Sequence, residues 1–236
     1  SGADDLWLIK TNFHGEREWS RVFGGGQNDY GRSVKETEDG GYIIAGETNS
    51  FGSGNYDVYL VRVDTAGNRL WDKTFGGLGD DIGYEVVGSA DGGYIIAGHT
   101  RSYGKGGDDA WLIKTGPKGK KEWSRFYGGS GYDNARSVQQ TTDGGYILTG
   151  GTTSYGSGNT DVWLVKVGPS GNKKWDRTFG GHKADSGYMV RQTMDGGYII
   201  VGETSSFASR GNSDVLLVKA DSLGNKLGQR AYGGKE

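Results

Sequence analysis

The chain has 236 residues, of which 47 are glycine, two are proline and none is cysteine, and its formal net charge is −2. The lack of cysteine excludes disulfides and thiolate zinc sites, and the balance of 27 basic against 29 acidic residues lacks the basic excess typical of nucleic-acid binding. No apolar run approaches the roughly 18 residues that a membrane-spanning helix needs. The apolar content is carried by tyrosine, tryptophan, phenylalanine and β-branched residues, which favour strands.

A repeat with a period of 52 residues runs along the whole chain. The motif Asp-Gly-Gly-Tyr starts at Asp39, Asp91, Asp143 and Asp195. A tryptophan recurs in step at Trp19, Trp71, Trp123 and Trp175. A third motif of the type DVWLVK starts at Asp5, Asp57, Asp109, Asp161 and, after one inserted residue, Asp214. A period of about 50 residues indicates a solenoid, an array or a propeller.

Each repeat contains four short runs typical of strands, separated by turn residues. In the second repeat these runs are 57–63, 69–75, 83–89 and 94–100. Gly-Asn and Asp-Gly pairs between apolar runs predict tight hairpins, and no helical periodicity interrupts them. Four antiparallel strands in one repeat predict one blade of a β-propeller.

We therefore predict an all-β fold, a β-propeller of four-stranded antiparallel blades that forms a single domain over 1–236. About 4.5 repeats fit into the chain, which leaves two alternatives: five blades with one incomplete, or four blades with a surplus strand pair. An incomplete ring is also what a fragment of a longer protein, or a ring completed by a second copy, would give. The predicted parts are an N-terminal half-blade at 5–23 and blades at 31–75, 83–127, 135–179 and 187–232.

The order of motifs FGGxxxD, DGGYIIAGxT and DVxLVKxxxxGNxxW resembles the secreted bacterial β-propeller repeats often called seven-bladed bacterial propeller repeats. The segment from Val63 to Trp71 is also similar to the tryptophan motif of quinoprotein-type propellers. The resemblance implies that the tryptophan strand is the outermost of each blade. It further implies that the protein is secreted or displayed on the cell surface, and it implies no single shared activity.

Long loops all emerge on one face of the predicted blades, so we expect any binding site there. Scaffold positions hardly change between repeats, whereas the beginning of the inner strand and the end of the next strand vary. The expected ligand-binding residues at or near these positions are Arg32, Tyr84, Arg136, Tyr188, Glu47, His99, Glu203, Tyr30, Asp81, Asp133 and Asp185. Planar donors, carboxylates and aromatic faces suit the hydroxyls and the apolar faces of sugars.

The repeated polar groups favour a non-enzymatic, multivalent and lectin-like carbohydrate-binding module. The motifs GxSxG, HExxH and the phosphate loop are absent, so the sequence predicts no enzyme. The alternative is a structural or protein-interaction domain of a secreted or cell-surface protein. Expected partners are a carbohydrate or a surface protein, with a homo-oligomer through the unpaired half-blade as a further alternative. We expect no cofactor or metal site; calcium on the repeated aspartates is the less favoured alternative.

Overall fold

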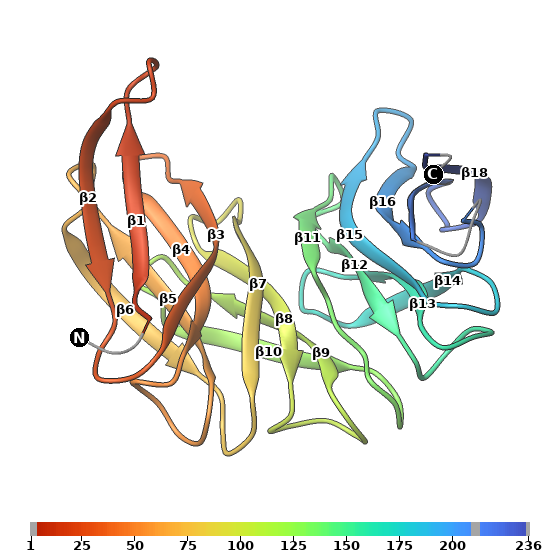
Figure 1. Cartoon of the computed structure of the whole chain (residues 1–236), viewed down its shortest axis with the longest axis horizontal. Coiled ribbons are helices and arrows are strands. Elements are labelled where there is room, and N and C mark those ends of the chain that lie inside the picture. The colour runs from red at the N-terminus through yellow and green to blue at the C-terminus, as the bar shows by residue number, and fades with distance from the viewer. Residues whose placement is uncertain (1–3, 209–212, 235–236) are drawn as a thin grey trace. The chain divides into compact units, whose positions relative to one another are not determined.

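The computed structural model describes residues 4–208 and 213–234, and the described residues form strands connected by turns and loops, with no helix. In that part of the chain no helix is long and apolar enough to cross a membrane. The strands, labelled in Figure 1, are β1 (Leu6–Thr11), β2 (Arg17–Phe23), β3 (Asp29–Glu36), β4 (Tyr42–Thr48), β5 (Asp57–Val63), β6 (Arg69–Phe75), β7 (Asp81–Gly88), β8 (Tyr94–Thr100), β9 (Asp109–Thr115), β10 (Lys121–Tyr127), β11 (Ser137–Gln140), β12 (Tyr146–Thr152), β13 (Asp161–Val167), β14 (Lys173–Phe179), β15 (Asp185–Gln192), β16 (Tyr198–Thr204), β17 (Asp214–Ala220) and β18 (Lys226–Tyr232).

The strands of the described residues pair into four four-stranded antiparallel sheets and one two-stranded sheet. The four-stranded sheets have the orders β3-β4-β5-β6, β10-β9-β8-β7, β11-β12-β13-β14 and β15-β16-β17-β18, and the two-stranded sheet is β1-β2. The predicted fold class is confirmed: each four-stranded sheet is a propeller-type blade, and β1-β2 is the half-blade.

The chain divides into two compact units, which we describe separately. The first unit comprises Ser1–Tyr103 and Ile113–Glu122, and the second comprises Gly104–Leu112 and Trp123–Glu236. The long loop expected between β16 and β17 includes residues 209–212, which lie outside the described residues.

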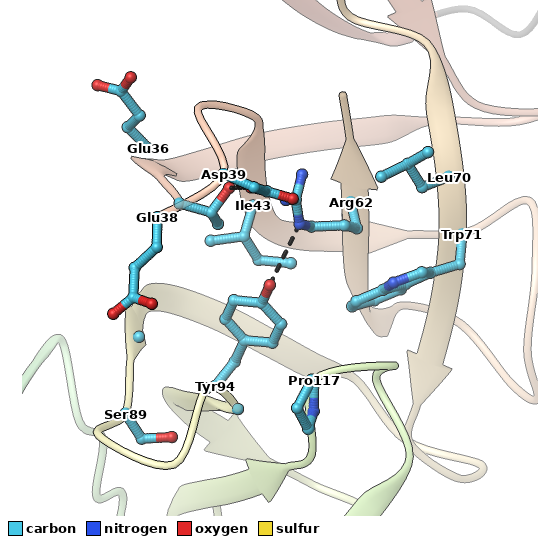
Figure 2. Close-up of a pocket in the computed structure, with 14 residues that line it drawn as sticks. Glu36, Glu38, Asp39, Ile43, Arg62, Leu70, Trp71, Ser89, Tyr94 and Pro117 are labelled. Carbon is cyan, nitrogen blue, oxygen red and sulfur yellow. Dashed lines mark hydrogen bonds and ion pairs between the residues drawn. The ribbon is translucent and has the colours of Figure 1, made fainter. Parts of the chain in front are cut away.

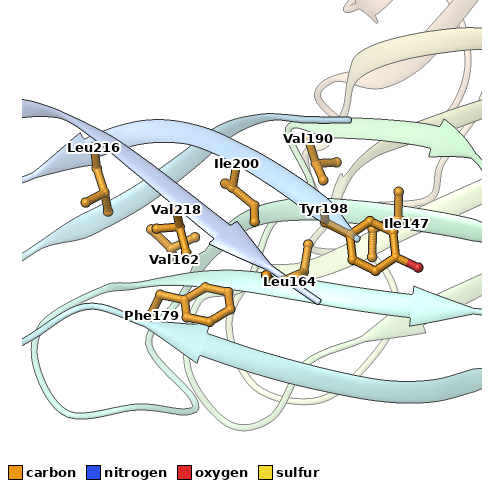
Figure 3. Packing of buried hydrophobic residues seen from close by; sticks show 10 residues of the cluster. Ile147, Val162, Leu164, Phe179, Val190, Tyr198, Ile200, Leu216 and Val218 are labelled. Carbon is orange, nitrogen blue, oxygen red and sulfur yellow. The ribbon is translucent and has the colours of Figure 1, made fainter. Parts of the chain in front are cut away.

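Several central strands of the sheets are buried on both faces. In β5, β8, β9, β12 and β13 every residue is buried, which explains why their sequences do not alternate between apolar and polar. Within the second unit, Ile147, Leu164 and Phe179 of one sheet pack against Tyr198 and Ile200 of the next (Figure 3). Each sheet face therefore depends on a neighbouring sheet for its burial.

The recurring tryptophan joins neighbouring sheets within each unit. The Trp19 ring lies 5.9 Å from the Tyr42 ring of the next sheet, and a Cβ at Gly67 would come 2.8 Å from Trp19 Cζ3. Gly67 also has a φ of 78°, which glycine adopts without strain. The same docking recurs as Trp71 with Gly119 and Tyr94, Trp123 with Gly171 and Tyr146, and Trp175 with Gly224 and Tyr198.

A β-bulge interrupts the first strand of the sheets near its beginning. The register with the second strand shifts between Gly31 and Ser33, between Gly83 and Glu85, and between Gly187 and Met189. The bulge brings a carbonyl oxygen so close to the second strand that a Cβ at Gly202 would lie 2.0 Å from the Ser186 oxygen. The glycine of the repeated AGxT motif is therefore required by this close approach. The equivalent contacts are Gly46 with Tyr30, Gly98 with Ile82 and Gly150 with Asn134.

We expect Gly202→Ala to destabilise the protein by about 1–3 kcal/mol, because the added methyl group forces the bulged backbone aside. Gly228→Ala is the matched control, since a Cβ at Gly228 would meet no atom within 4 Å. Urea unfolding followed by circular dichroism measures both variants. A Gly202→Ala variant as stable as Gly228→Ala would contradict the role of the close approach.

Candidate functional site

The residue that varies between repeats is the extra residue of each bulge. Arg32, Tyr84 and Tyr188 occupy the three register shifts. In the third sheet Asp133 pairs with Thr152 and Ser137 with Thr149, so the stretch around Arg136 also has one residue more than its partner strand. Bulges redirect side chains and are frequent beside active sites, so the fold gives these four positions a site-forming geometry.

The first unit contains a cluster of Arg32, Glu47, Tyr84 and His99, which we call the first polar cluster. Arg32 Nε donates to Glu47 Oε2 at 2.6 Å, and Nη2 donates to the other carboxylate oxygen. The bond to Glu47 raises the pKa of Arg32 above its ordinary value. The guanidinium carbon lies 5.4 Å from the centre of the Tyr84 ring, which lies 5.5 Å from the His99 ring. Since Glu47 and His99 are buried, Arg32 and Tyr84 form the accessible part.

The second unit contains the equivalent residues Arg136, Tyr188 and Glu203, which we call the second polar cluster. The Arg136 guanidinium carbon lies 5.0 Å from the centre of the Tyr188 ring. Burial and a hydrogen bond to Glu203 raise the pKa of the Tyr188 hydroxyl, and nearby Arg136 partly opposes the rise. Gly151 stands where the first cluster has Glu47, so the carboxylate that binds Arg32 has no counterpart in the second cluster. Tyr188 is 40% exposed, which leaves its ring accessible.

The other predicted ligand residues have hydrogen-bond partners outside these clusters, although Tyr30 stands opposite Glu47 in the strand pairing. Tyr30 donates its hydroxyl hydrogen to Asp4 at 3.0 Å, and this bond raises the pKa of Tyr30 to about 12. Asp81, Asp133 and Asp185 are completely buried at the beginning of their strands. Asp133 Oδ2, for example, accepts bonds from the Gly129 amide and the Ser154 hydroxyl. These three carboxylates hold the crossing loops in place beneath the surface.

The repeated aspartates considered for calcium also bind loop backbone. The Lys105 amide donates to Asp109 Oδ2 at 2.6 Å, and the Ser157 amide donates to Asp161 Oδ2 at 2.8 Å. Burial, together with the neighbouring Asp81, raises the pKa of Asp57 to about 6. Among residues 4–208 and 213–234 no group of three or more histidine, cysteine or acidic side chains is arranged to hold a metal.

Sequence reasoning missed a set of buried cations that bind the Asp-Gly-Gly turns. The side chains of Arg62, Lys114 and Lys166 are 5%, 4% and 7% exposed. Each pairs with the turn aspartate of its own sheet, as Lys166 does with Asp143 at 2.9 Å. The signal was present in the sequence, because a lysine or arginine recurs at one position of every DVWLVK-type motif. The pairs are Arg62 with Asp39, Lys114 with Asp91, Lys166 with Asp143 and Lys219 with Asp195.

Sequence reasoning also missed a pocket of about 380 Å³ in the first unit. It lies at the ends of β3 and β4 that are remote from the first polar cluster, between the turns after β3 and β7. Figure 2 shows Ile43 and Arg62 above Tyr94 and Pro117, with the Trp71 ring at one side. Arg62 Nε donates to the Tyr94 hydroxyl at 3.2 Å, and Arg62 also pairs with Asp39, so the guanidinium is neutralised from within.

No family model matches the chain. Regulatory protein FlaEY of Caulobacter vibrioides is 25% identical over 114 residues, which are 43% of this chain and 12% of that protein. The chain therefore spans far less than two thirds of the length of this relative.

Solved structures are similar at low sequence identity. The endo-arabinase of Bacteroides thetaiotaomicron is 12% identical with a TM-score of 0.50, over 85% of this chain and 80% of that one. The endo-arabinanase of Bacillus licheniformis is 11% identical with a TM-score of 0.47, over 86% and 79%. A Synechocystis apocarotenoid oxygenase variant is 11% identical with a TM-score of 0.46, over 98% and 50%. The likeness to the Bacteroides structure shows the fold, and the repeated blades resemble those of propeller proteins.

This comparison contradicts the prediction of a non-enzymatic module, and with it the lectin and the interaction-domain alternatives. The similar Bacteroides structure is that of an endo-arabinase, so a fold of this kind occurs in an enzyme. The prediction relied on missing contiguous motifs such as GxSxG. A site on this fold gathers single residues from different sheets, which a search for short motifs does not detect.

Loss of the turn carboxylate in Asp143→Asn is expected to destabilise the protein by about 1–2 kcal/mol at pH 7, because the buried Lys166 ammonium loses its counter-charge. Burial raises the pKa of Asp143, but bonds from Thr141 and Lys166 outweigh it and lower the pKa to about 2. The ionised pair therefore stabilises the fold above the unfolded pKa of about 3.9 and loses this effect as the pH falls toward 2.

Urea unfolding at pH 7 and pH 3 measures this effect. The variant should lose less stability than the unmodified chain over that interval. Lys166→Met is the control and should be better tolerated at pH 7, because Asp143 is exposed and keeps its hydration. An Asp143→Asn variant with the unmodified pH profile would contradict the assignment.

Proposed function

We propose that the chain is a carbohydrate-active enzyme that hydrolyses glycosidic bonds, with the second polar cluster as its reacting groups. The observation that supports this is the Tyr188 hydroxyl bonded to the Glu203 carboxylate, with the Arg136 guanidinium over the Tyr188 ring. These residues are a nucleophile, a base and a cation on one bulged strand and its neighbours. The likeness to an endo-arabinase supports a polymeric glycoside as substrate.

The residue set favours one form of this chemistry. Most glycosidases use two carboxylates beside the scissile bond, whereas sialidases use a tyrosine nucleophile. The second polar cluster has one carboxylate, so we assign Tyr188 as nucleophile and Glu203 as its base. The tyrosine oxygen bonds to the anomeric carbon as the glycosidic bond breaks, Glu203 takes the tyrosine proton, and solvent water protonates the departing oxygen. Water then attacks the anomeric carbon of the glycosyl-tyrosine, and its proton passes to the tyrosine oxygen as that oxygen departs. The hydroxide left by the first step takes the proton back from Glu203, which restores the carboxylate.

The first polar cluster suits binding more than reaction. Its carboxylate, Glu47, is buried and held by both arms of Arg32, which lowers its value as a base. Arg32 and Tyr84 offer a planar donor and an aromatic ring to a sugar, with His99 behind them. We assign these residues to substrate contacts.

The finer identity of the repeats is also a proposal. The motif order supports a place among the secreted bacterial β-propeller repeats, and the tryptophan docking supports a relation to the quinoprotein-type tryptophan motif. Placement outside the cell or on its surface follows from that relation. Polymeric carbohydrate in the envelope or the surroundings is then the natural partner, and assembly through the half-blade β1-β2 remains a prediction.

Release of reducing sugar from arabinan, and of fluorophore from 4-methylumbelliferyl arabinofuranoside and sialoside, tests the proposal. We expect turnover of at least one substrate. Tyr188→Phe and Glu203→Gln should each lower kcat/KM by about 10²–10⁴-fold, because a nucleophile or its base is lost.

Tyr132→Phe is the matched control, since it removes an exposed hydroxyl elsewhere in the second unit and should keep full activity. Circular dichroism confirms that each variant folds. Activity that survives in both Tyr188→Phe and Glu203→Gln, or no turnover of any of these substrates by the folded chain, would overturn the proposal.

A further inference from the structure

We infer that the pocket of the first unit binds an organic cation, an ammonium group carried on an apolar body. The pocket is a second site, independent of the polar clusters. Its lining joins three carboxylates, one at the end of β3 and two in the turn that follows, to a wall formed by Leu70, Trp71, Tyr94 and Pro117.

The charge of the lining selects the ligand. Asp39 is neutralised by Arg62, whose guanidinium is 5% exposed and also bonded to Tyr94. Glu36 and Glu38 also line the pocket, both are exposed, and no lysine or second arginine lies in the lining. The lining therefore holds two more acidic than basic side chains. Glu36 lies near Lys10 of β1, so Glu38 supplies most of the charge that attracts a cation and repels an anion.

The walls select an apolar body next to that charge. Trp71 and Tyr94 lie 6.0 Å apart with their rings inclined at 56°, and the Pro117 ring lies below them (Figure 2). Aromatic faces bind ammonium groups with about 0.5–2 kcal/mol in other proteins. In Figure 2 the Glu38 side chain extends toward the Ser89 turn on the open side of the pocket. A bound ammonium would be held between Glu38 and the aromatic wall.

Comparison of the repeats shows that the acidic and apolar lining of the pocket is not retained at the equivalent positions of the second unit. The second unit retains the scaffold as Asp143, Trp175 and Tyr198. It has Gln140, Thr142 and Lys174 where the first unit has Glu36, Glu38 and Leu70. The scaffold is thus shared, whereas the lining changes from acidic and apolar to neutral and basic. A packing role would give no reason for this reversal of charge.

Isothermal titration with 2-phenylethylammonium, its neutral isostere 2-phenylethanol and the anion 3-phenylpropionate tests the inference. We expect the cation to bind at least tenfold more tightly than the alcohol, and the anion not to bind. Binding should weaken in 0.5 M NaCl, because the carboxylates are exposed to screening.

The variant Glu36→Gln/Glu38→Thr/Leu70→Lys gives the pocket the lining of the second unit. It should weaken cation binding at least tenfold without loss of folding, since the chain already accepts these residues at the equivalent positions. Lys174→Leu is the control outside the pocket and should leave the affinity unchanged. Equal binding of the three probes, or an unchanged affinity in the triple variant, would overturn the inference. Hydrolysis by the second polar cluster is measured separately and is unaffected by either result.

Discussion

The close approach between the first and second strands of each sheet is the constraint on which the site depends. A carbonyl oxygen of the bulged strand occupies the space that a Cβ at Gly202 would need. Only glycine allows the second strand to pass there, and the bulge then turns Tyr188 out of the regular alternation. A scaffold residue that varies little thus fixes the position of a residue that varies. The chemistry of the site can change between repeats without disturbing the backbone.

A second constraint acts across the sheets. Strands such as β8 and β13 are buried on both faces, so a blade is stable only between neighbours. The tryptophan that docks on a turn glycine and a tyrosine of the next sheet fixes that stacking. Buried cationic side chains stabilise the Asp-Gly-Gly turns. Lys166, for example, donates hydrogen bonds to the Asp143 carboxylate and to the Val167 carbonyl oxygen.

The two units use one scaffold for different chemistry. Arg32 is neutralised by Glu47, whereas Arg136 has Gly151 at that place and lies beside a tyrosine bonded to Glu203. The opposite strand ends differ as well, since Glu38 and Leu70 of the pocket become Thr142 and Lys174. A duplicated pair of blades, with the framework kept and the exposed positions changed, accounts for both differences.

The sequence by itself determined the all-β fold, the four-stranded repeat and the variable positions, because turn residues and apolar runs act locally and the period repeats them. It identified Arg32, Tyr84, Arg136 and Tyr188 as a set, since their position varies between repeats within a nearly constant framework. Only the tertiary structure decided which of them meet. Glu47 reaches Arg32 and Glu203 reaches Tyr188 through strand pairing and a bulge, and neither can be derived from spacing. The tertiary structure also decided that Asp81, Asp133 and Asp185 are buried and that a pocket lies at the strand ends remote from the first polar cluster. Both depend on packing between neighbouring sheets.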